Sequence, residues 1–190
     1  MKSEPGQSLK GQLLVAMPQM TDPRFARSVV YICAHSDNEG AMGLVINKPA
    51  GSLTVNELLA HLNLEPSRGN RQRKVHFGGP VEPGRGFVLH TSDYREDATM
   101  LVGDEFAVTA TLDILRAIGK GEGPRRNLLA LGYAGWAPRQ LDAEIQANGW
   151  LSVAADTDLV FDDDFDAKWQ RALAKLGVDL SMLSTDAGHA

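Results

Sequence analysis

Cysteine is the scarcest residue of structural interest in this sequence, since Cys33 is the only one among 190 residues. A single cysteine excludes an intrachain disulfide framework and is typical of a reducing compartment. Long apolar runs are missing too. No window approaches eighteen consecutive apolar residues, so we expect no membrane span, and the N-terminal MKSEPGQSLKG has no apolar core of a secretory signal. These absences predict a cytoplasmic protein.

Several motifs that would point to an enzyme are also absent. The sequence has no Walker A motif, no GxGxxG after a strand and no GxSxG nucleophile elbow. Its five histidines have no short spacing of the zinc type. The acidic residues between Asp156 and Asp166 lack the spacing and glycine of a calcium loop, and we interpret them as a cap for the next helix. We therefore expect neither a metal nor another cofactor.

Positive charge is in deficit, with 19 basic against 24 acidic residues and a formal net charge of −5. This balance argues against a general binder of nucleic acid or anionic membranes. The one basic cluster, at Arg68, Arg71, Arg73 and Lys74, has no aromatic neighbours, and no helix-turn-helix pair is evident. We expect a solvated loop there, and direct DNA binding that is weak and non-specific.

The rest of the chain is organised around residues 24–50. Two apolar, strand-like runs, Ser28–His35 and Ala41–Asn47, flank the polar turn Ser36–Gly40. The short connection predicts a β-hairpin. Gly43 within the second run predicts a bulge or a close approach of two backbones.

Other segments predict a mixture of strands and helices. Strands are expected at Gly11–Met17, Val75–Phe77, Gly86–Thr91, Met100–Leu101, Phe106–Val108, Asn127–Tyr133, Trp150–Ala154 and Leu159–Phe161. Helices are expected after a Thr54/Glu57 capping box, at Thr111–Ile118 with Gly119 as its stop, from Pro138 to Asn148, and at Phe165–Leu176.

These elements do not alternate as regular βαβ units. They predict the α+β class, as a single domain with a bulged mixed β-sheet flanked by helices. We expect one domain over residues 11–183, a disordered leader at 1–10 and a disordered tail at 184–190.

Several ordered segments together carry a family likeness. They are GQLLVAMPQMTDPRFARSVVYICAH, GAMGLVINKP, the pair HFGGPV and GFVLH, and GYAGWAPRQLDAEIQANGW, running from about Gly11 to Trp150. This set resembles the YqgE/AlgH family of bacterial proteins. The chain departs from the family at Ala137 and Arg139, where glycines are usual around the Trp-Pro step. The resemblance implies a single α/β domain in the bacterial cytoplasm, no established enzyme activity and, from the AlgH name, a role in transcriptional regulation.

A first candidate site consists of glycine-rich turns and one asparagine. Its residues are Asn47, Gly78, Gly79, Gly135 and Trp136. Glycine lets a backbone approach a ligand closely, and free amides at the start of the following helix could receive an anion. The alternative is that these glycines serve turn geometry alone. A ligand bound at this edge would be a small molecule.

A second candidate site pairs Cys33 with His35. Two positions apart on a strand, they are expected on one face, with Cα atoms roughly 6–7 Å apart. A protonated His35 in contact would lower the pKa of the thiol. The alternative is a buried cysteine that packs as a small hydrophobic residue.

The sequence as a whole predicts a non-catalytic binding protein with a regulatory role. Two alternatives stay open. One is a small-molecule or nucleotide-binding enzyme that uses the glycine-rich edges, and the other is a thiol sensor that acts through Cys33.

Overall fold

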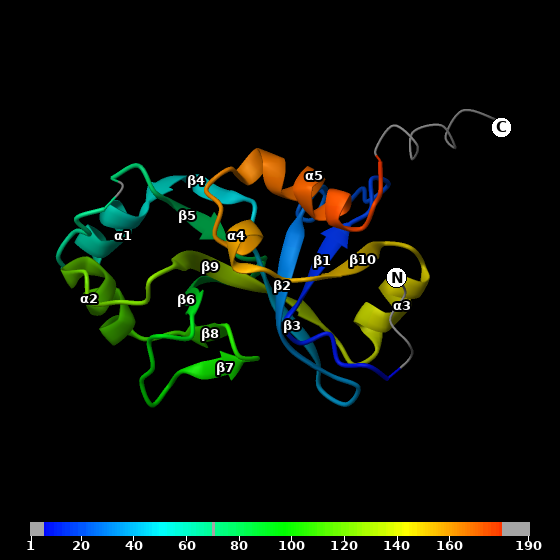
Figure 1. Ribbon diagram of the computed structural model, residues 1–190, viewed down its shortest axis with the longest axis horizontal. Coiled ribbons are helices and arrows are strands. Elements are labelled where there is room, and N and C mark those ends of the chain that lie inside the picture. The colour runs from blue at the N-terminus through cyan, green and yellow to red at the C-terminus, as the bar shows by residue number, and fades with distance from the viewer. Residues whose placement is uncertain (1–5, 70, 180–190) are drawn as a thin grey trace.

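The computed structural model describes residues 6–69 and 71–179, which fold around one ten-stranded sheet. The main path of the sheet is β10-β1-β2-β3-β9-β6-β8-β7, with β5 beside β9 and β4 beside β5. The β5–β9 pair is parallel and the other pairs are antiparallel. The sheet is thus mixed, and it curls into a half-barrel with helices around it (Figure 1). The predicted α+β fold is confirmed.

The strands are β1 (Gln12–Ala16), β2 (Val29–Ser36), β3 (Gly40–Val45), β4 (Pro49–Thr54), β5 (Lys74–Phe77), β6 (Val81–Thr91), β7 (Met100–Val102), β8 (Phe106–Thr109), β9 (Asn127–Trp136) and β10 (Trp150–Ala154). The helices are α1 (Val55–His61), α2 (Leu112–Lys120), α3 (Gln140–Gln146), α4 (Thr157–Val160) and α5 (Phe165–Lys175). None of these described helices is long and apolar enough to cross a membrane.

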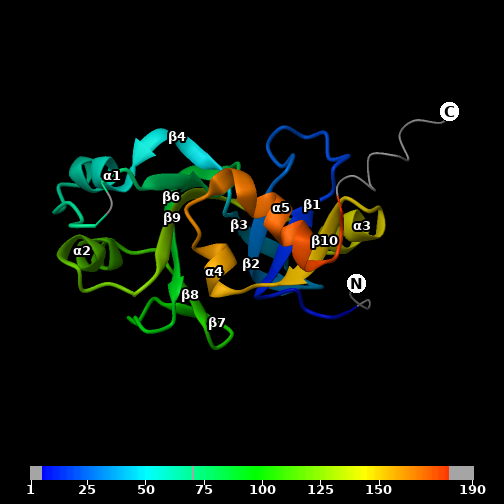
Figure 2. The ribbon, with the colours of Figure 1, turned by 45° about the horizontal axis from the view of Figure 1, so that its top comes forward.

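Helices cover both faces of the sheet, and each covered face has its own hydrophobic core. α4 and α5 pack over β1 and β2, where Trp169 belongs to the same core as Leu13 and Tyr31. α3 covers the other face of the same strands, around Trp136 and Trp150. α1 and α2 cover β6 and β9 at the far end of the molecule (Figures 1 and 2).

The predicted hairpin is confirmed, because β2 and β3 pair in antiparallel register. Ile32 faces Gly43 and Ala34 faces Met42, so Cys33 is the extra residue of a bulge in β2. A Cβ on Gly43 would lie 2.9 Å from the Tyr31 carbonyl oxygen, so the predicted close approach of two backbones is confirmed as well.

The bulge overturns the expectation that Cys33 and His35 share a face. Cys33 packs with Tyr31 in the core under α5. The extra residue resets the alternation, so that His35 pairs with Ala41, which belongs to the core on the α3 side. The two side chains therefore point to opposite faces of the sheet.

Helix boundaries follow local capping in some places and depart from the sequence prediction in others. The Thr54/Glu57 capping box is present at the start of α1. α2 continues through Gly119 and ends at Gly121, whose φ of 77° provides the left-handed cap. α3 begins at Gln140 rather than at Pro138, because Arg139 takes a left-handed φ of 64° just before it.

The predicted strand at Leu159–Phe161 is wrong. Asp156 accepts a hydrogen bond from the Leu159 amide and starts the short helix α4 instead. A short apolar run fits either structure, and the cap decides between them. Asp164 caps α5 in the same way by accepting from Ala167, as expected of the acidic run.

Four stretches are more ordered than the sequence predicted. β4 was not expected at all, and β6 and β9 extend well beyond the predicted strands. Leu9, placed in the predicted disordered leader, is buried and donates its amide to His35 Nδ1. Residues 1–5 of that leader and the predicted tail at 184–190 lie outside the described residues.

Candidate functional site

The end of the central hairpin and the start of α5 surround a cavity of about 490 Å³. Its lining residues come from the loop before β2, the segment after β3 and the first half of α5: Ala26, Arg27, Asn47, Lys48, Pro49, Phe165, Asp166, Trp169 and Gln170. Asn47 is the one member of this set that the sequence had singled out. The central stretch therefore does help to form a cavity, with partners that lie more than a hundred positions away in the chain.

Asp22 folds the loop that brings Arg27 to the cavity. Its backbone carbonyl accepts from the amides of Phe25 and Ala26, and its carboxylate accepts from the Arg24 amide and guanidinium. These hydrogen bonds from Arg24 lower the pKa of Asp22. Arg27 then takes a left-handed φ of 57°, and its guanidinium lies 4.8 Å from the centre of the Trp169 ring.

Asn47 holds this loop against the end of β3. Its side-chain oxygen accepts from the Val29 amide and its NH₂ group donates to the Arg27 carbonyl, both at 2.8 Å. The side chain is buried and its two polar atoms are both engaged with backbone. Asn47 thus positions Arg27, and its side-chain amide is already occupied by backbone hydrogen bonds.

The cavity carries two cationic side chains, Arg27 and Lys48, and one carboxylate, Asp166. Neither cation forms a salt bridge with a described residue. Partial burial lowers the pKa of Lys48, and Asp22 only partly opposes this effect. A half-buried ammonium without a close counter-ion is stabilised by any anion that approaches it.

Behind Phe165 lies a buried polar pair. The His76 ring is 4.7 Å from the Phe165 ring, centre to centre. Burial, together with the charges of Lys168 and Arg73, places the pKa of His76 well below its ordinary value. The carbonyls of Leu129 and Ile46 oppose that shift from nearby, yet neither ring nitrogen has a described hydrogen-bond partner of good geometry.

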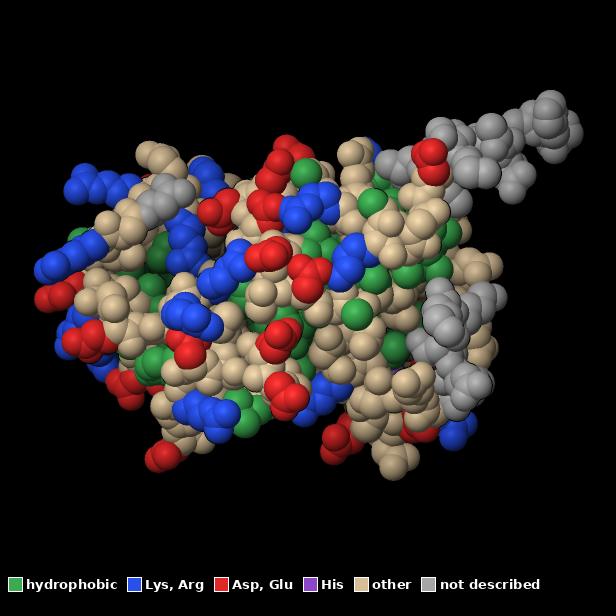
Figure 3. Space-filling model, in the orientation of Figure 1, with side chains coloured by type: hydrophobic (Ala, Val, Ile, Leu, Met, Phe, Trp, Pro, Cys, Tyr) green, Lys and Arg blue, Asp and Glu red, His purple; other side chains and the backbone are tan. Residues whose placement is uncertain are grey.

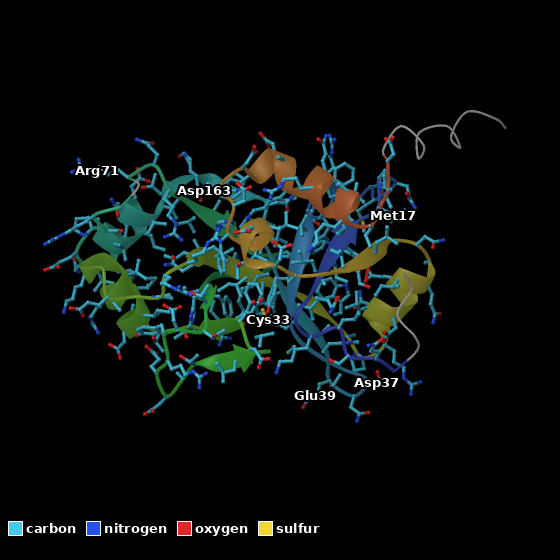
Figure 4. All side chains as sticks on the ribbon, in the orientation of Figure 1. Met17, Cys33, Asp37, Glu39, Arg71 and Asp163 are labelled. Atoms are coloured by element: carbon cyan, nitrogen blue, oxygen red, sulfur yellow. The ribbon has the colours of Figure 1, made fainter. Side chains whose placement is uncertain are left out.

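Lys168 is fully buried beside this histidine. Its ammonium donates to the Ile46 carbonyl at 2.7 Å and to the Val160 carbonyl at 2.8 Å. Burial lowers its pKa to about 7, and Asp163, which lies in the connection before α5 (Figure 4), opposes the shift. Lys168 therefore ties α5 to the end of β3, under the wall of the cavity.

This arrangement can hold an anion. The lining contains no serine, threonine, cysteine or histidine, and its potential nucleophiles are the Lys48 amine and the Asp166 carboxylate. Two cations beside the rings of Phe165 and Trp169 suit a ligand that has a negative group and an apolar or planar body.

The glycines of the predicted binding edge are not brought together around this cavity. A Cβ on Gly78 would lie 2.3 Å from the Gly132 carbonyl oxygen, and one on Gly79 would lie 2.1 Å from the Tyr133 carbonyl carbon. Gly78 also donates to Leu131 and accepts from Val45 through its backbone. These glycines permit contact between two backbones, which occupies the space that a ligand would need.

Gly135 and Trp136 differ from that pair. A Cβ on Gly135 would make only ordinary contacts, with Tyr133 at 3.5 Å the nearest. The Trp136 ring is buried among Phe25 and Trp150 in the core on the α3 side. Just before α3, the Ala137 amide donates to the Gln140 side chain and the Gln140 amide donates to the Ala137 carbonyl, so neither amide is free for an anion.

Cys33 lies inside the sheet (Figure 4) and is fully buried, as its apolar strand predicted. Burial raises the pKa of the thiol to about 12. His35 is on the opposite face and cannot stabilise a thiolate there. The geometry is that of a packed cysteine, which is inert compared with an exposed low-pKa thiol.

Native Cys33 should accordingly react slowly with a water-soluble disulfide reagent. With a thiol pKa of about 12 against 9.0 for a free group, the thiolate at pH 8 is roughly a thousandfold scarcer, before any steric protection. Labelling rates measured from pH 6 to 9, with and without denaturant, test this expectation. Fast labelling of the folded protein with a midpoint well below 9 would instead favour the thiol sensor.

His35, Asp37 and Asp142 place three potential metal ligands within 4.8 Å of one another. Asp37 lies at the exposed β2–β3 turn with Glu39 (Figure 4). His35 Nδ1, however, accepts from the Leu9 amide at 2.9 Å, so the proton of the neutral imidazole is on Nε2. Nε2 faces Asp142 at 3.8 Å. A protonated nitrogen does not ligate a metal, so this cluster is better suited to holding Leu9 against the sheet.

Fold and site define a single α+β domain with a curled, bulged mixed sheet and a cation-lined cavity beside its central hairpin. The sequence model of the AlgH-like family matches residues 13–181, and the chain belongs to that family. The resemblance in the sequence is thereby confirmed.

Relatives of this chain include two named UPF0301 proteins. One, from Afipia carboxidovorans, is 58% identical over 191 residues, covering 96% of this chain and 90% of the relative. Another, from Rhodopseudomonas palustris, is 57% identical over 195 residues, covering 98% of this chain and 89% of the relative. These names state no reaction, ligand or partner.

Two solved structures have a similar fold. The solution structure of the AlgH protein from Pseudomonas aeruginosa is 43% identical, covers 100% of both chains and gives a TM-score of 0.77. An X-ray structure of a protein from Corynebacterium diphtheriae covers 91% of this chain and 88% of its own, with 22% identity and a TM-score of 0.72. The second likeness concerns the fold alone.

Sequence reasoning missed Arg27, Lys48, Phe165 and Trp169 as neighbours of Asn47. A usable signal was present for two of them, because Arg27 and Lys48 flank the two apolar runs of a hairpin whose outer ends must meet. The aromatic residues gave no such signal. Their helical spacing predicted a core face, and Trp169 does lie in the core while its ring also supports Arg27.

Proposed function

We propose that this protein is a non-catalytic binding protein, and that the cavity between Arg27, Lys48 and Trp169 binds a small anionic ligand with an apolar or planar body. The observation that carries the proposal is the pair of cations without a salt bridge to a described carboxylate, next to two aromatic rings. A ligand carboxylate or phosphate would supply the missing charge, and its body would contact Phe165 or Trp169.

Binding without reaction is the simpler use of these residues. Lys48 and Asp166 are the titratable groups at the cavity apart from Arg27, and no hydroxyl or thiol stands beside them. A regulatory role in the cytoplasm, which the family resemblance implies, belongs to the same proposal. The protein would act there by sensing the concentration of its ligand. Basic and acidic side chains are interspersed on the face in Figure 3, which supports a small anion as ligand ahead of a nucleic acid.

The test is a titration of ¹⁵N-labelled protein with sodium benzoate and with phenyl phosphate. We expect saturable shifts of the Lys48 amide and the Trp169 indole N–H, weakened by added salt. Arg27→Gln and Lys48→Gln should each raise Kd roughly 10- to 100-fold, because a charge-assisted hydrogen bond contributes roughly 1.5–3 kcal/mol. Arg116→Gln, which removes an equal charge from exposed α2, should leave Kd unchanged.

Equal binding by the wild type and the Arg27→Gln/Lys48→Gln double variant would contradict the proposal. So would shifts that are confined to residues elsewhere in the folded protein. Either result would move the anion site away from this cavity.

A further inference from the structure

A separate cavity of about 250 Å³ lies between α1 and α2, at the opposite end of the sheet from α3. Its walls are leucines of the two helices, Leu58, Leu112 and Leu115, and its floor is formed by strands β6 and β9. None of its lining residues is charged. Leu112 is 50% exposed and Leu62 is 39% exposed, so leucine side chains also border its opening.

The cavity exists because two side chains are missing from its floor. Alternation along β6 puts Gly86 and Val88 on one face, the face covered by α1 and α2, and Gly84 also lines the cavity. Gly86 stands opposite Leu131 on β9. A Cβ on Gly86 would meet only a Leu131 methyl group, at 3.9 Å, and one on Gly84 would meet nothing within 4 Å.

These two glycines therefore differ from Gly79, where another backbone fills the space. Neither Gly84 nor Gly86 has a positive φ. Backbone conformation does not require glycine at either position, and what the glycines provide is open volume beside Leu131.

The side-chain hydroxyls that line the cavity are already hydrogen-bonded to other residues. Thr109 Oγ1 bonds to His90 Nε2 at 2.8 Å and to Thr99 Oγ1 at 2.9 Å. Thr111 Oγ1 donates to Glu96 and accepts from the Ile114 amide. A ligand in this cavity would find no free hydrogen-bond partner among these hydroxyls and no counter-charge, so a charged or strongly polar ligand would lose its hydration without compensation.

We infer that this cavity is a second ligand site, and that it takes one small, neutral, apolar molecule of the size of a substituted benzene. Apolar cavities of about 150 Å³ in proteins bind benzene, so 250 Å³ accommodates a somewhat larger molecule. A docked helix would need a groove that receives anchors over two or more turns, which is more than this cavity offers.

Toluene and benzoate form a matched pair of probes, nearly equal in size and different in charge. Protein with ¹³C-labelled leucine and valine methyl groups would be titrated with each. Toluene should produce saturable shifts of the Leu58, Leu115 and Leu129 methyl signals, and benzoate should not. Because benzoate reports on the Arg27–Lys48 cavity, the two proposals succeed or fail independently.

Gly86→Ile should fill the cavity from its floor and weaken toluene binding at least about tenfold, while the well-dispersed methyl spectrum of the folded protein persists. A β-branched residue suits this strand position. Gly69→Ile is the control, because Gly69 is exposed, has no positive φ and has only the Ser67 hydroxyl within 4 Å of an added Cβ, at 3.7 Å.

Linear shifts of Leu62 and Leu112 alone, without saturation, would mean adsorption on exposed leucines and would overturn the inference. The same conclusion would follow if Gly86→Ile kept the methyl spectrum of a folded protein and bound toluene as the wild type does. Saturable binding of benzoate at the α1–α2 methyl groups would refute the neutral character of the ligand.

Discussion

Gly79→Ala is expected to abolish the native fold, although it adds a single methyl group. The new Cβ would stand 2.1 Å from the Tyr133 carbonyl carbon and 2.2 Å from its oxygen. Backbone atoms cannot move aside as a flexible side chain can. The backbone at Gly79 and the backbone of β9 would therefore have to move apart. We expect a loss on the order of 5 kcal/mol or more, which reaches the whole stability of a marginally stable domain.

Denaturant unfolding monitored by tryptophan fluorescence measures this loss, and Gly135→Ala is the matched control. Gly135 lies on β9, two residues after Tyr133, and was part of the same predicted binding edge, yet its added Cβ would make only ordinary contacts at 3.5 Å and 3.8 Å. It should change the free energy of unfolding by less than about 1 kcal/mol. A Gly79→Ala protein with the wild-type unfolding midpoint would show that this glycine does not serve backbone packing.

The second large effect is a rise in stability with pH that comes from Lys168. Burial lowers the pKa of this lysine to about 7 in the folded protein, from an ordinary 10.5. Below pH 7 both the folded and the unfolded states hold the proton, and the cost of burying the charge is fully present. Between about 7 and 10.5 the unfolded chain keeps the proton that the folded protein has lost. The free energy of unfolding therefore increases with pH across this window.

The interval from pH 7 to 9 isolates this lysine best. The lowered pKa values of His76 and His90 act below their ordinary 6.5. The raised pKa of Cys33 acts in the opposite direction only above about 9. With about 1.4 kcal/mol per pH unit at full slope, Lys168 should add roughly 2 kcal/mol of stability between pH 7 and 9.

Urea unfolding at several pH values within that interval gives the slope, and Lys168→Met is the comparison. Methionine keeps an unbranched stem of similar length without a charge, so most of the rise should vanish in the variant. The slope does not fix the stability of the variant at pH 7. There two effects oppose each other, because the Ile46 and Val160 carbonyls lose a donor while the buried charge is removed. A wild type and a variant with parallel pH profiles would refute the assignment.

The hairpin, the capping box and the buried state of Cys33 could be predicted because each depends on neighbours in the sequence. β-Branched runs around SDNEG suffice for β2 and β3, and Thr54 needs only Glu57 three residues later. Prediction failed where two local signals competed. Leu159–Phe161 is apolar enough for a strand, and the Asp156 cap turned it into a helix.

The candidate sites were harder to predict, because their geometry depends on registers that no local pattern fixes. The bulge at Cys33 reverses the face of His35 with one extra residue. Asn47 was chosen as a ligand contact, yet its amide is engaged with Val29 and Arg27. Gly78 and Gly79 were predicted to line the ligand-binding edge, yet they allow two backbone segments to come into close contact.

By itself, the sequence determined the family, the α+β class and most strands, since these follow from the order of apolar runs and turn residues along the chain. Only the tertiary structure decided that Arg27 lies on Trp169, that His76 and Lys168 are buried side by side, and that Gly84 and Gly86 leave a cavity under α1 and α2. The physical reason is the distance along the chain over which each effect acts. Strand and cap preferences act over a few residues, whereas burial, desolvation and cavity volume depend on which distant elements the curled sheet brings into contact.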